Sequence, residues 1–214
     1  MNHNAVLKRG IEFHTQGQLD QALADYSQVI DSAVAEDVEL MGLALYYRGS
    51  VYQRLGEHER LISDMTRIVE YRGEVSAELV AQASAMRGES FAVQGELEAA
   101  VSDYTVIIES REGLPTGMLL SALLCRGRIY AEQKRHELAI GELTTVIEQG
   151  SEHRLPAHFL AEAYWFRGQA YFAEADYTRA AEDLSIVVSS QWLGTTGQQS
   201  AEELLAECRR RLAE

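Results

Sequence analysis

An arginine and an acidic residue recur together along this chain, always 16 residues apart. The five pairs are Arg9 with Asp25, Arg48 with Asp64, Arg87 with Asp103, Arg126 with Glu142, and Arg167 with Asp183. Two roles fit such a set: a ladder of charged sites that bind a ligand, or a repeated ion pair that fixes the packing of two segments. Because a ligand site would normally occur once, the sequence favours structural ion pairs.

The other reactive side chains form no catalytic or metal-binding group. His153 and His158 are five residues apart around Pro156, a spacing that suits neither a strand nor a helix ligand pair. Cys125 and Cys208 are the only cysteines, which predicts neither a zinc site nor a disulfide framework. The sequence has no HExxH, CxxC or GxSxG motif and no phosphate-binding glycine loop. We therefore predict no catalytic residue, no metal and no cofactor, and expect that the chain is not an enzyme.

The composition is that of a folded, acidic chain. Its 214 residues are 46% hydrophobic and include only 2 prolines, which favours helix because proline interrupts helices. The formal net charge of -14 argues against nucleic acid and against an anionic membrane surface, since both attract a cationic face. The charge fits either a solvated exterior or attraction to a basic partner. No run approaches 18 apolar residues, so we expect no membrane span and a cytoplasmic location.

The dipeptide Arg-Gly marks an internal repeat. Five of its six occurrences are spaced by 39, 39, 39 and 41 residues, and their glycines are Gly10, Gly49, Gly88, Gly127 and Gly168; the sixth, Arg72-Gly73, lies outside this period. Other columns keep a fixed distance from each glycine. An aromatic residue stands three positions after it, and an alanine or leucine twelve positions after it. The acid follows at fifteen positions, a bulky apolar residue at sixteen, and a pair of β-branched residues closes the repeat. In the third repeat these are Phe91, Ala100, Asp103, Tyr104 and Ile107-Ile108.

Each repeat reads as two helices joined at a turn. In the third repeat, Leu79, Ala83 and Met86 recur at about 3.6-residue intervals, Gly95 ends this first helix, and a second helix follows from Leu97. Neither helix can bury its apolar face alone, so stacked repeats would build one continuous core.

The glycines imply that two helix backbones approach closely, because a mid-helix glycine costs about 1 kcal/mol relative to alanine. We expect the residue twelve positions later to fill that gap; it is alanine in four repeats and Leu61 in the second. Met65 also departs from the Tyr or Leu of its column. The second repeat is therefore expected to be an irregular joint.

These columns resemble the tetratricopeptide repeat (TPR) family. The resemblance is carried by the glycine, the aromatic residue, the alanine and the following aromatic residue, as in Gly88, Phe91, Ala100 and Tyr104, and it covers residues 1 to about 192. It implies an all-α, right-handed α-α superhelix of five helix-turn-helix repeats. The usual family repeat has about 34 residues, so this chain looks like a variant with about 39-residue repeats.

Two departures concern the turns. The closing proline of the family motif is absent, and Lys134 and Ala175 replace the turn glycine in the fourth and fifth repeats. The extra length is expected to extend the first helices, with candidate starts at Asp37, Ser76, Pro115 and Pro156.

We predict one solenoid domain over residues 1–214. The expected repeats are about 1–35, 36–74, 75–113, 114–154 and 155–192. A loop, WLGTTGQQS, then precedes a capping helix at about 198–213. This helix places Leu204, Leu205, Cys208 and Leu212 on one face, which would cover the last apolar surface of the repeats.

The resemblance also implies a binding surface, since the first helices of this family line a concave side that usually takes a peptide. Carried over position by position, the residues expected to line this groove are Tyr46, Gln53, Arg54, Gln82, Glu89, Arg128, Trp165, Gln169 and Phe172. The lysine and asparagine clamp with which some members grip a peptide C-terminus is not matched, because the sites are mostly apolar, as at Leu7 and Ile11. The aromatic residues fit either an exposed groove or the core.

Three functions remain open from the sequence. The leading one is a scaffold or adaptor that binds a partner protein or peptide through the groove. The second is a structural protein that forms homo-oligomers through its surface or ends. The third, an enzyme or small-molecule carrier, would need a deep pocket with converging polar groups.

Overall fold

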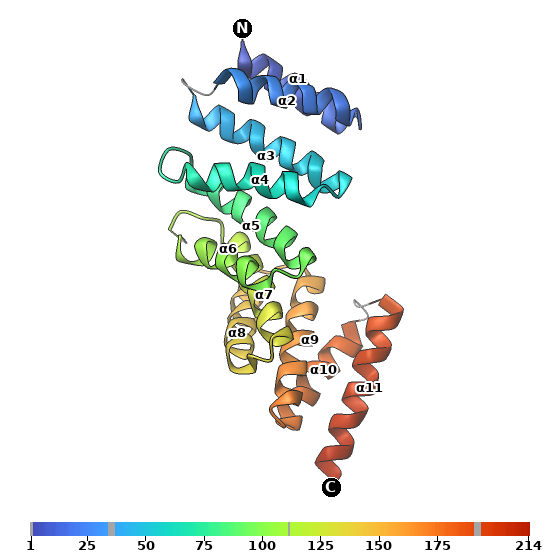
Figure 1. Cartoon of the computed structure of the whole chain (residues 1–214). Coiled ribbons are helices and arrows are strands. Elements are labelled where there is room, and N and C mark those ends of the chain that lie inside the picture. The colour runs from blue at the N-terminus through green and yellow to red at the C-terminus, as the bar shows by residue number, and fades with distance from the viewer. Residues whose placement is uncertain (1, 34–36, 111, 191–193) are drawn as a thin grey trace. The chain divides into compact units, whose positions relative to one another are not determined.

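The computed structural model describes residues 2–33, 37–110, 112–190 and 194–214. Over these residues the chain forms eleven helices and no strand, which confirms the predicted all-α helical-repeat fold (Figure 1). The helices are α1 (His3–Thr15), α2 (Leu19–Ala33), α3 (Val38–Leu55), α4 (His58–Glu70), α5 (Ala77–Gln94), α6 (Leu97–Glu109), α7 (Thr116–Glu132), α8 (His136–Glu152), α9 (Ala157–Ala173), α10 (Tyr177–Ser190) and α11 (Gly194–Ala213).

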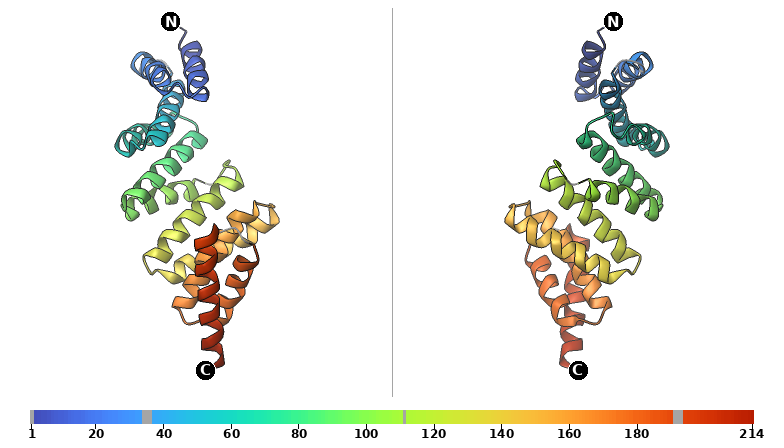
Figure 2. Two further views of the ribbon diagram at one scale, coloured as in Figure 1. Left: turned by 90° about the vertical axis from the view of Figure 1, so that its right-hand side faces the viewer. Right: turned by 90° about the vertical axis from the view of Figure 1, so that its left-hand side faces the viewer.

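The helices form two compact units, Met1–Leu114 and Pro115–Glu214. The first unit holds α1 to α6, which are repeats one to three, and each helix packs against the next along the chain (Figure 2). The second unit holds α7 to α10, which are repeats four and five, followed by α11. The boundary between the units, after Leu114, lies one residue from the predicted boundary between repeats three and four. The single-domain organisation stays a prediction.

The first helices begin where the sequence predicts. Asp37, Ser76, Pro115 and Pro156 are the N-cap residues of α3, α5, α7 and α9. The side chains of Asp37 and Ser76 accept hydrogen bonds from the backbone N–H three residues later, at 2.9 and 3.4 Å. Such caps satisfy donors that the first helical turn leaves unpaired.

The turns inside the repeats share one left-handed residue. In repeats one to three this residue is glycine, as at Gly95 with φ +80°. In repeats four and five Lys134 and Ala175 take the same conformation, both with φ +59°. The turn thus keeps its conformation without glycine. Because Lys134 and Ala175 carry a Cβ atom, the left-handed conformation has a steric cost for them that glycine does not have.

The mid-helix glycines do face the second helix, but the expected partner was wrong. A Cβ built on Gly10 would lie 2.8 Å from the Tyr26 ring, and one on Gly127 would lie 3.0 Å from Leu143 Cγ. Tyr26 and Leu143 belong to the bulky column sixteen residues after the glycine, and not to the alanine column. The bulky residue therefore lies against the glycine backbone, because only glycine leaves room for it.

This geometry removes the reason for an irregular joint in the second repeat. The residue opposite Gly49 is Met65, whose Cε lies 2.5 Å from the position of a Cβ on Gly49. Leu61 is fully buried in the core of the first unit, away from the atoms nearest that glycine. Leu61 is a buried core residue in a column that is alanine elsewhere, and the irregular joint itself stays a prediction.

The last helix is longer than predicted. Residues 194–197, expected to precede the capping helix, form the first turn of α11. Leu205 and Cys208 are buried against Tyr171 of α9 and against α10, which fits the expected covering role. Leu212, expected on the same face, is 53% exposed because it lies near the end of the helix.

Candidate functional site

The five arginine–acid pairs are all formed, each between the first and second helix of one repeat. In the four aspartate pairs the guanidinium binds the carboxylate with two hydrogen bonds of 2.6–2.9 Å, from Nε to Oδ2 and from Nη2 to Oδ1. This two-pronged geometry is the strong form of an arginine–carboxylate pair. Registry of the two helices is the role that we propose for it.

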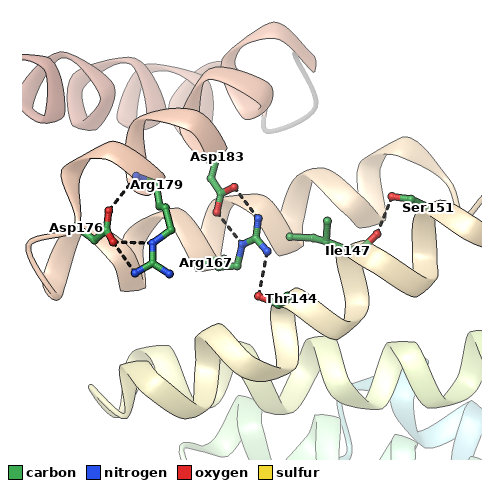
Figure 3. A network of polar contacts seen from close by, with 7 residues as sticks. All are labelled: Thr144, Ile147, Ser151, Arg167, Asp176, Arg179 and Asp183. Atoms are coloured by element: carbon green, nitrogen blue, oxygen red, sulfur yellow. Dashed lines mark hydrogen bonds and ion pairs between the residues drawn. The ribbon is translucent and has the colours of Figure 1, made fainter.

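Arg48, Arg87 and Arg167 also contact the preceding repeat. The Nη1 atom of the guanidinium donates to a hydroxyl on the second helix of that repeat, and Figure 3 shows this for Arg167, which lies between Asp183 and Thr144. The three bonds are Arg48 to Ser27 at 3.0 Å, Arg87 to Thr66 at 2.9 Å, and Arg167 to Thr144 at 3.0 Å.

Sequence reasoning missed these hydroxyls, although they form a column. Two residues after each acid stands a serine or threonine in every repeat: Ser27, Thr66, Thr105, Thr144 and Ser185. A search for hydroxyls at fixed distance from the acid would have found them. Each bridging arginine therefore ties its own two helices together and also ties its repeat to the one before.

Arg9 differs because the first repeat has no described helix before it. Its side chain is 56% exposed, whereas those of the other four arginines are 14–16% exposed. The acids are largely buried throughout, including Asp25. Arg9 therefore keeps the ion pair of the other arginines and differs from them only in its greater exposure to solvent.

The fourth pair is less complete because its acid is a glutamate. Both Nε and Nη2 of Arg126 donate to the same Glu142 oxygen, Oε1, at 2.9 and 2.5 Å. The other oxygen, Oε2, is buried and finds no hydrogen-bond partner among the described residues. Burial raises the pKa of Glu142, against the lowering effect of Arg126.

The aromatic column has a clear role beside the arginines. Four of them lie over the aromatic ring four residues later, as Arg48 over Tyr52 at 5.9 Å and Arg87 over Phe91 at 6.0 Å. Burial lowers the pKa of Arg48, but the hydrogen bond and charge of Asp64 outweigh it, so its pKa is raised. The guanidinium groups are held as permanent cations between carboxylate, ring and hydroxyl.

In the first unit the predicted groove residues lie on adjoining first helices. Gln53 Nε2 donates to Glu89 Oε2 at 2.9 Å, which joins α3 to α5. Arg54 Nη1 donates to the backbone oxygen of His14 at 3.5 Å, which joins α3 to α1. Gln53, Arg54 and Glu89 are exposed, so this row of first helices presents polar groups to solvent.

Two further predicted residues of this unit are partly covered. Tyr46 is half-buried and packs edge-on against Tyr47, with ring centroids 5.7 Å apart. Burial raises the pKa of Tyr46, and so does Tyr47. Gln82 is half-buried and donates to Glu78 one turn earlier, at 3.4 Å.

The second unit presents a comparable row on α7 and α9. Arg128 and Glu162 form an ion pair of 3.4 Å between these helices. Trp165 and Phe172 are half-buried and pack against the cluster that includes Tyr171 and Leu205, while Gln169 is half-buried on the same helix. The aromatic residues thus contribute to the core and to the surface at once.

Within the part of the chain that the structure describes, no group of histidine, cysteine or acidic side chains is arranged to hold a metal ion. None of the described helices is both long and apolar enough to cross a membrane.

The arrangement of helices is similar to that of solved TPR proteins. A TPR protein from Parabacteroides merdae superposes with a TM-score of 0.74 at 16% identity, over 99% of this chain and 76% of that one. MamA superposes with a TM-score of 0.70 at 17% identity, over 88% and 91% of the two chains. YrrB, a TPR protein with an unusual peptide-binding site, gives 0.69 at 18% identity over 92% and 90%.

No protein-family model and no curated protein matches the sequence. At identities below one fifth the structural similarity concerns the fold alone. On that evidence the chain has a TPR-like helical-repeat fold.

Proposed function

We propose that this chain is a protein-interaction scaffold that binds a peptide or protein partner on the surface of its first helices. In the first unit this surface holds Tyr46, Gln53, Arg54, Gln82 and Glu89; in the second it holds Arg128, Trp165, Gln169 and Phe172. The observation that carries the proposal is that, within each unit, polar side chains join neighbouring first helices, Gln53 to Glu89 in the first unit and Arg128 to Glu162 in the second, while the arginine–acid pairs are already engaged inside the repeats.

The second helices differ from the first helices in how much of their surface is free to bind a partner. Their apolar faces are buried between repeats, and the arginines of the next repeat occupy their hydroxyls. The first-helix row instead combines exposed polar groups with half-buried rings, a mixture typical of interaction surfaces. The net charge of -14 favours a basic partner. We place the protein in the cytoplasm and regard it as a TPR variant with about 39-residue repeats.

The test is capture of partners from a lysate of the cells that make the protein. The variant Gln53→Ala, Glu89→Ala removes both ends of one hydrogen bond, so no buried group is left unpaired. The matched control, Ser63→Ala, Ser102→Ala, changes two exposed residues on the second helices of the same unit. We expect the first variant to lose a partner that the control retains.

A second variant, Trp165→Ala, Phe172→Ala, tests the second unit, with thermal melting to verify that it stays folded. If both surface variants capture the same proteins as the wild type, the first-helix surface is not the binding site.

Self-assembly is the competing function, and it predicts a molecular mass that rises with concentration in sedimentation equilibrium. A monomer at all concentrations supports the scaffold.

A further inference from the structure

A pocket lies beside the turn between α4 and α5, wholly within the first unit. Its volume is about 250 Å³, and valine and alanine side chains supply most of its lining. The residues that matter below are Arg72, Val75, Val80, Ala81, Val106 and Ser110. None of them belongs to the first-helix surface proposed to bind a partner, so the pocket is a separate feature of the chain.

The third repeat has short side chains here, at positions where other repeats carry longer ones. Val75 and Val80 stand thirteen and eight residues before the marker glycine, where the fourth and fifth repeats have leucine at both positions. Val106 stands eighteen residues after that glycine, where the second repeat has Arg67. The Nη2 atom of Arg67 lies 3.9 Å from Sδ of Met41, which takes the position of Val80 in the second repeat. The pocket thus lies where the corresponding side chains of other repeats are longer.

The turn that forms one wall of the pocket is held in place by α3. Glu39 accepts hydrogen bonds of 2.8 Å from both the backbone N–H and the hydroxyl of Ser76, the N-cap residue of α5. Inside the turn, the N–H groups of Glu74 and Val75 donate to the carbonyl oxygen of Tyr71 at 2.9 and 3.2 Å. The wall is therefore fixed before anything binds, and a preformed site loses little conformational freedom on binding.

Arg72 gives the pocket a cationic edge in an acidic chain. Its side chain is exposed, and it makes no hydrogen bond or ion pair with the residues that the structure describes. Other arginines of the same unit are paired with acids, namely Arg9, Arg48, Arg60 and Arg87. A guanidinium is always charged and is complementary to a carboxylate, and its long side chain can place it over the mouth of the pocket.

We propose that this pocket binds a small monocarboxylate with an apolar tail. The tail would lie against Val75, Val80 and Val106, and the carboxylate would pair with Arg72. A water-sized group takes about 30 Å³, so the pocket has room for roughly eight such groups, which suits the chain of octanoate. The hydroxyl of Ser110, the C-cap residue of α6, is half-buried and can donate to the same carboxylate. This inference goes beyond the proposed function and does not rest on it.

The lining favours a free acid over the C-terminus of a peptide. A peptide would bring backbone N–H and C=O groups against valine and alanine side chains, which offer them no hydrogen bonds. The carboxylate of a free acid needs only the groups at the edge of the pocket, Arg72 and Ser110.

The binding test titrates octanoate into the full chain, with octanamide as the neutral probe of the same shape. NMR follows the methyl groups of Val75, Val80 and Val106. We expect saturable shifts with octanoate, and binding of octanamide about three- to fivefold weaker, the range for an ion pair exposed to solvent. Equal binding of the two probes, or no saturable shift with octanoate, overturns the proposal. Tighter binding of N-acetylglycyl-leucine than of octanoate would also overturn it, because the pocket would then take the C-terminus of a peptide.

Two variants check the position. Val75→Leu, Val80→Leu gives the third repeat the leucines of the fourth and fifth, and should abolish the octanoate shifts at Val106 without lowering the melting temperature, because the leucines fill the space. Arg72→Gln changes an exposed residue and should remove the preference for octanoate over octanamide.

The matched control is Arg60→Gln, at an exposed arginine in the first turn of α4 and outside the pocket, which should keep that preference. If the double valine variant binds octanoate like the wild type, or if Arg72→Gln keeps the preference, the pocket is not the site.

Discussion

Arg87 and Thr66 lie in consecutive repeats, and the Nη1 atom of Arg87 donates a hydrogen bond to the Thr66 hydroxyl at 2.9 Å. The same guanidinium binds Asp103 in its own repeat with bonds of 2.9 and 2.6 Å. One side chain thus links three helices, α4, α5 and α6. A solenoid, in which each repeat contacts only its neighbours, depends on such links between repeats.

Substitutions of Thr66 and of Arg87 should lower the free energy of unfolding by different amounts. Thr66→Val deletes only the inter-repeat bond and should cost about 1.5–3 kcal/mol, the range for a hydrogen bond to a charged group. Arg87→Ala should cost about 3–5 kcal/mol, because it leaves the buried carboxylate of Asp103 unpaired. Arg9→Ala is the control: it also leaves a buried acid, Asp25, unpaired, but it breaks no described bond to another repeat, so it should cost less than Arg87→Ala. Denaturant unfolding measures all three, and equal losses for Arg9→Ala and Arg87→Ala would contradict the linking role.

Shortening Glu142 should improve the fourth pair. Glu142→Asp would let Arg126 bind both carboxylate oxygens, as in the other four repeats, and would remove the unpaired oxygen. We expect a gain of about 1 kcal/mol in denaturant unfolding, the usual net value of one hydrogen bond. The reverse change, Asp103→Glu, is the control and should destabilise. A loss of stability for Glu142→Asp would show that the longer side chain is needed there.

The turn residues with positive φ predict opposite effects for opposite substitutions. Ala175→Gly should stabilise by about 0.5–1 kcal/mol, since alanine is strained at φ +59° and glycine is not. Gly95→Ala, at φ +80°, should destabilise by a similar or larger amount. Thermal melting of the two variants checks the pair; a lower melting temperature for Ala175→Gly would refute the strain.

The mid-helix glycines should differ in how well they tolerate a methyl group. Gly10→Ala places a Cβ against the buried, rigid ring of Tyr26, and we expect a loss of about 1–3 kcal/mol. Gly49→Ala places its Cβ against the flexible side chains of Met65 and Met86, and its gain of about 1 kcal/mol in helix propensity should nearly offset the cost. Denaturant unfolding of the two variants measures the difference. Equal losses of stability would mean that the closeness of the helix backbones, and not the nature of the facing side chain, determines whether a methyl group is tolerated.

The helices and their starts were predictable because they depend on local sequence. Asp37 and Ser76 cap helices by contacts three residues away, and periodic apolar residues mark the helix faces. The arginine–acid pairing was predictable from its constant spacing. These features repeat, and repetition separates them from chance.

What could not be predicted depends on contacts between helices. Nothing local shows that Gly10 faces Tyr26 and not Ala22, because both follow at helical spacing on the second helix. The half-buried state of Trp165 likewise depends on how α9 packs against its neighbours.

Site-specific crosslinking tests the central claim, that the partner binds the first-helix surface. A photoreactive p-benzoylphenylalanine is placed at Gln53 on α3 or at Ser63 on α4, both exposed residues of the first unit, in protein made in its own cells. We predict that irradiation gives a discrete covalent adduct with another protein from position 53 and none from position 63. An adduct from position 63 alone, or none from position 53, would contradict the account.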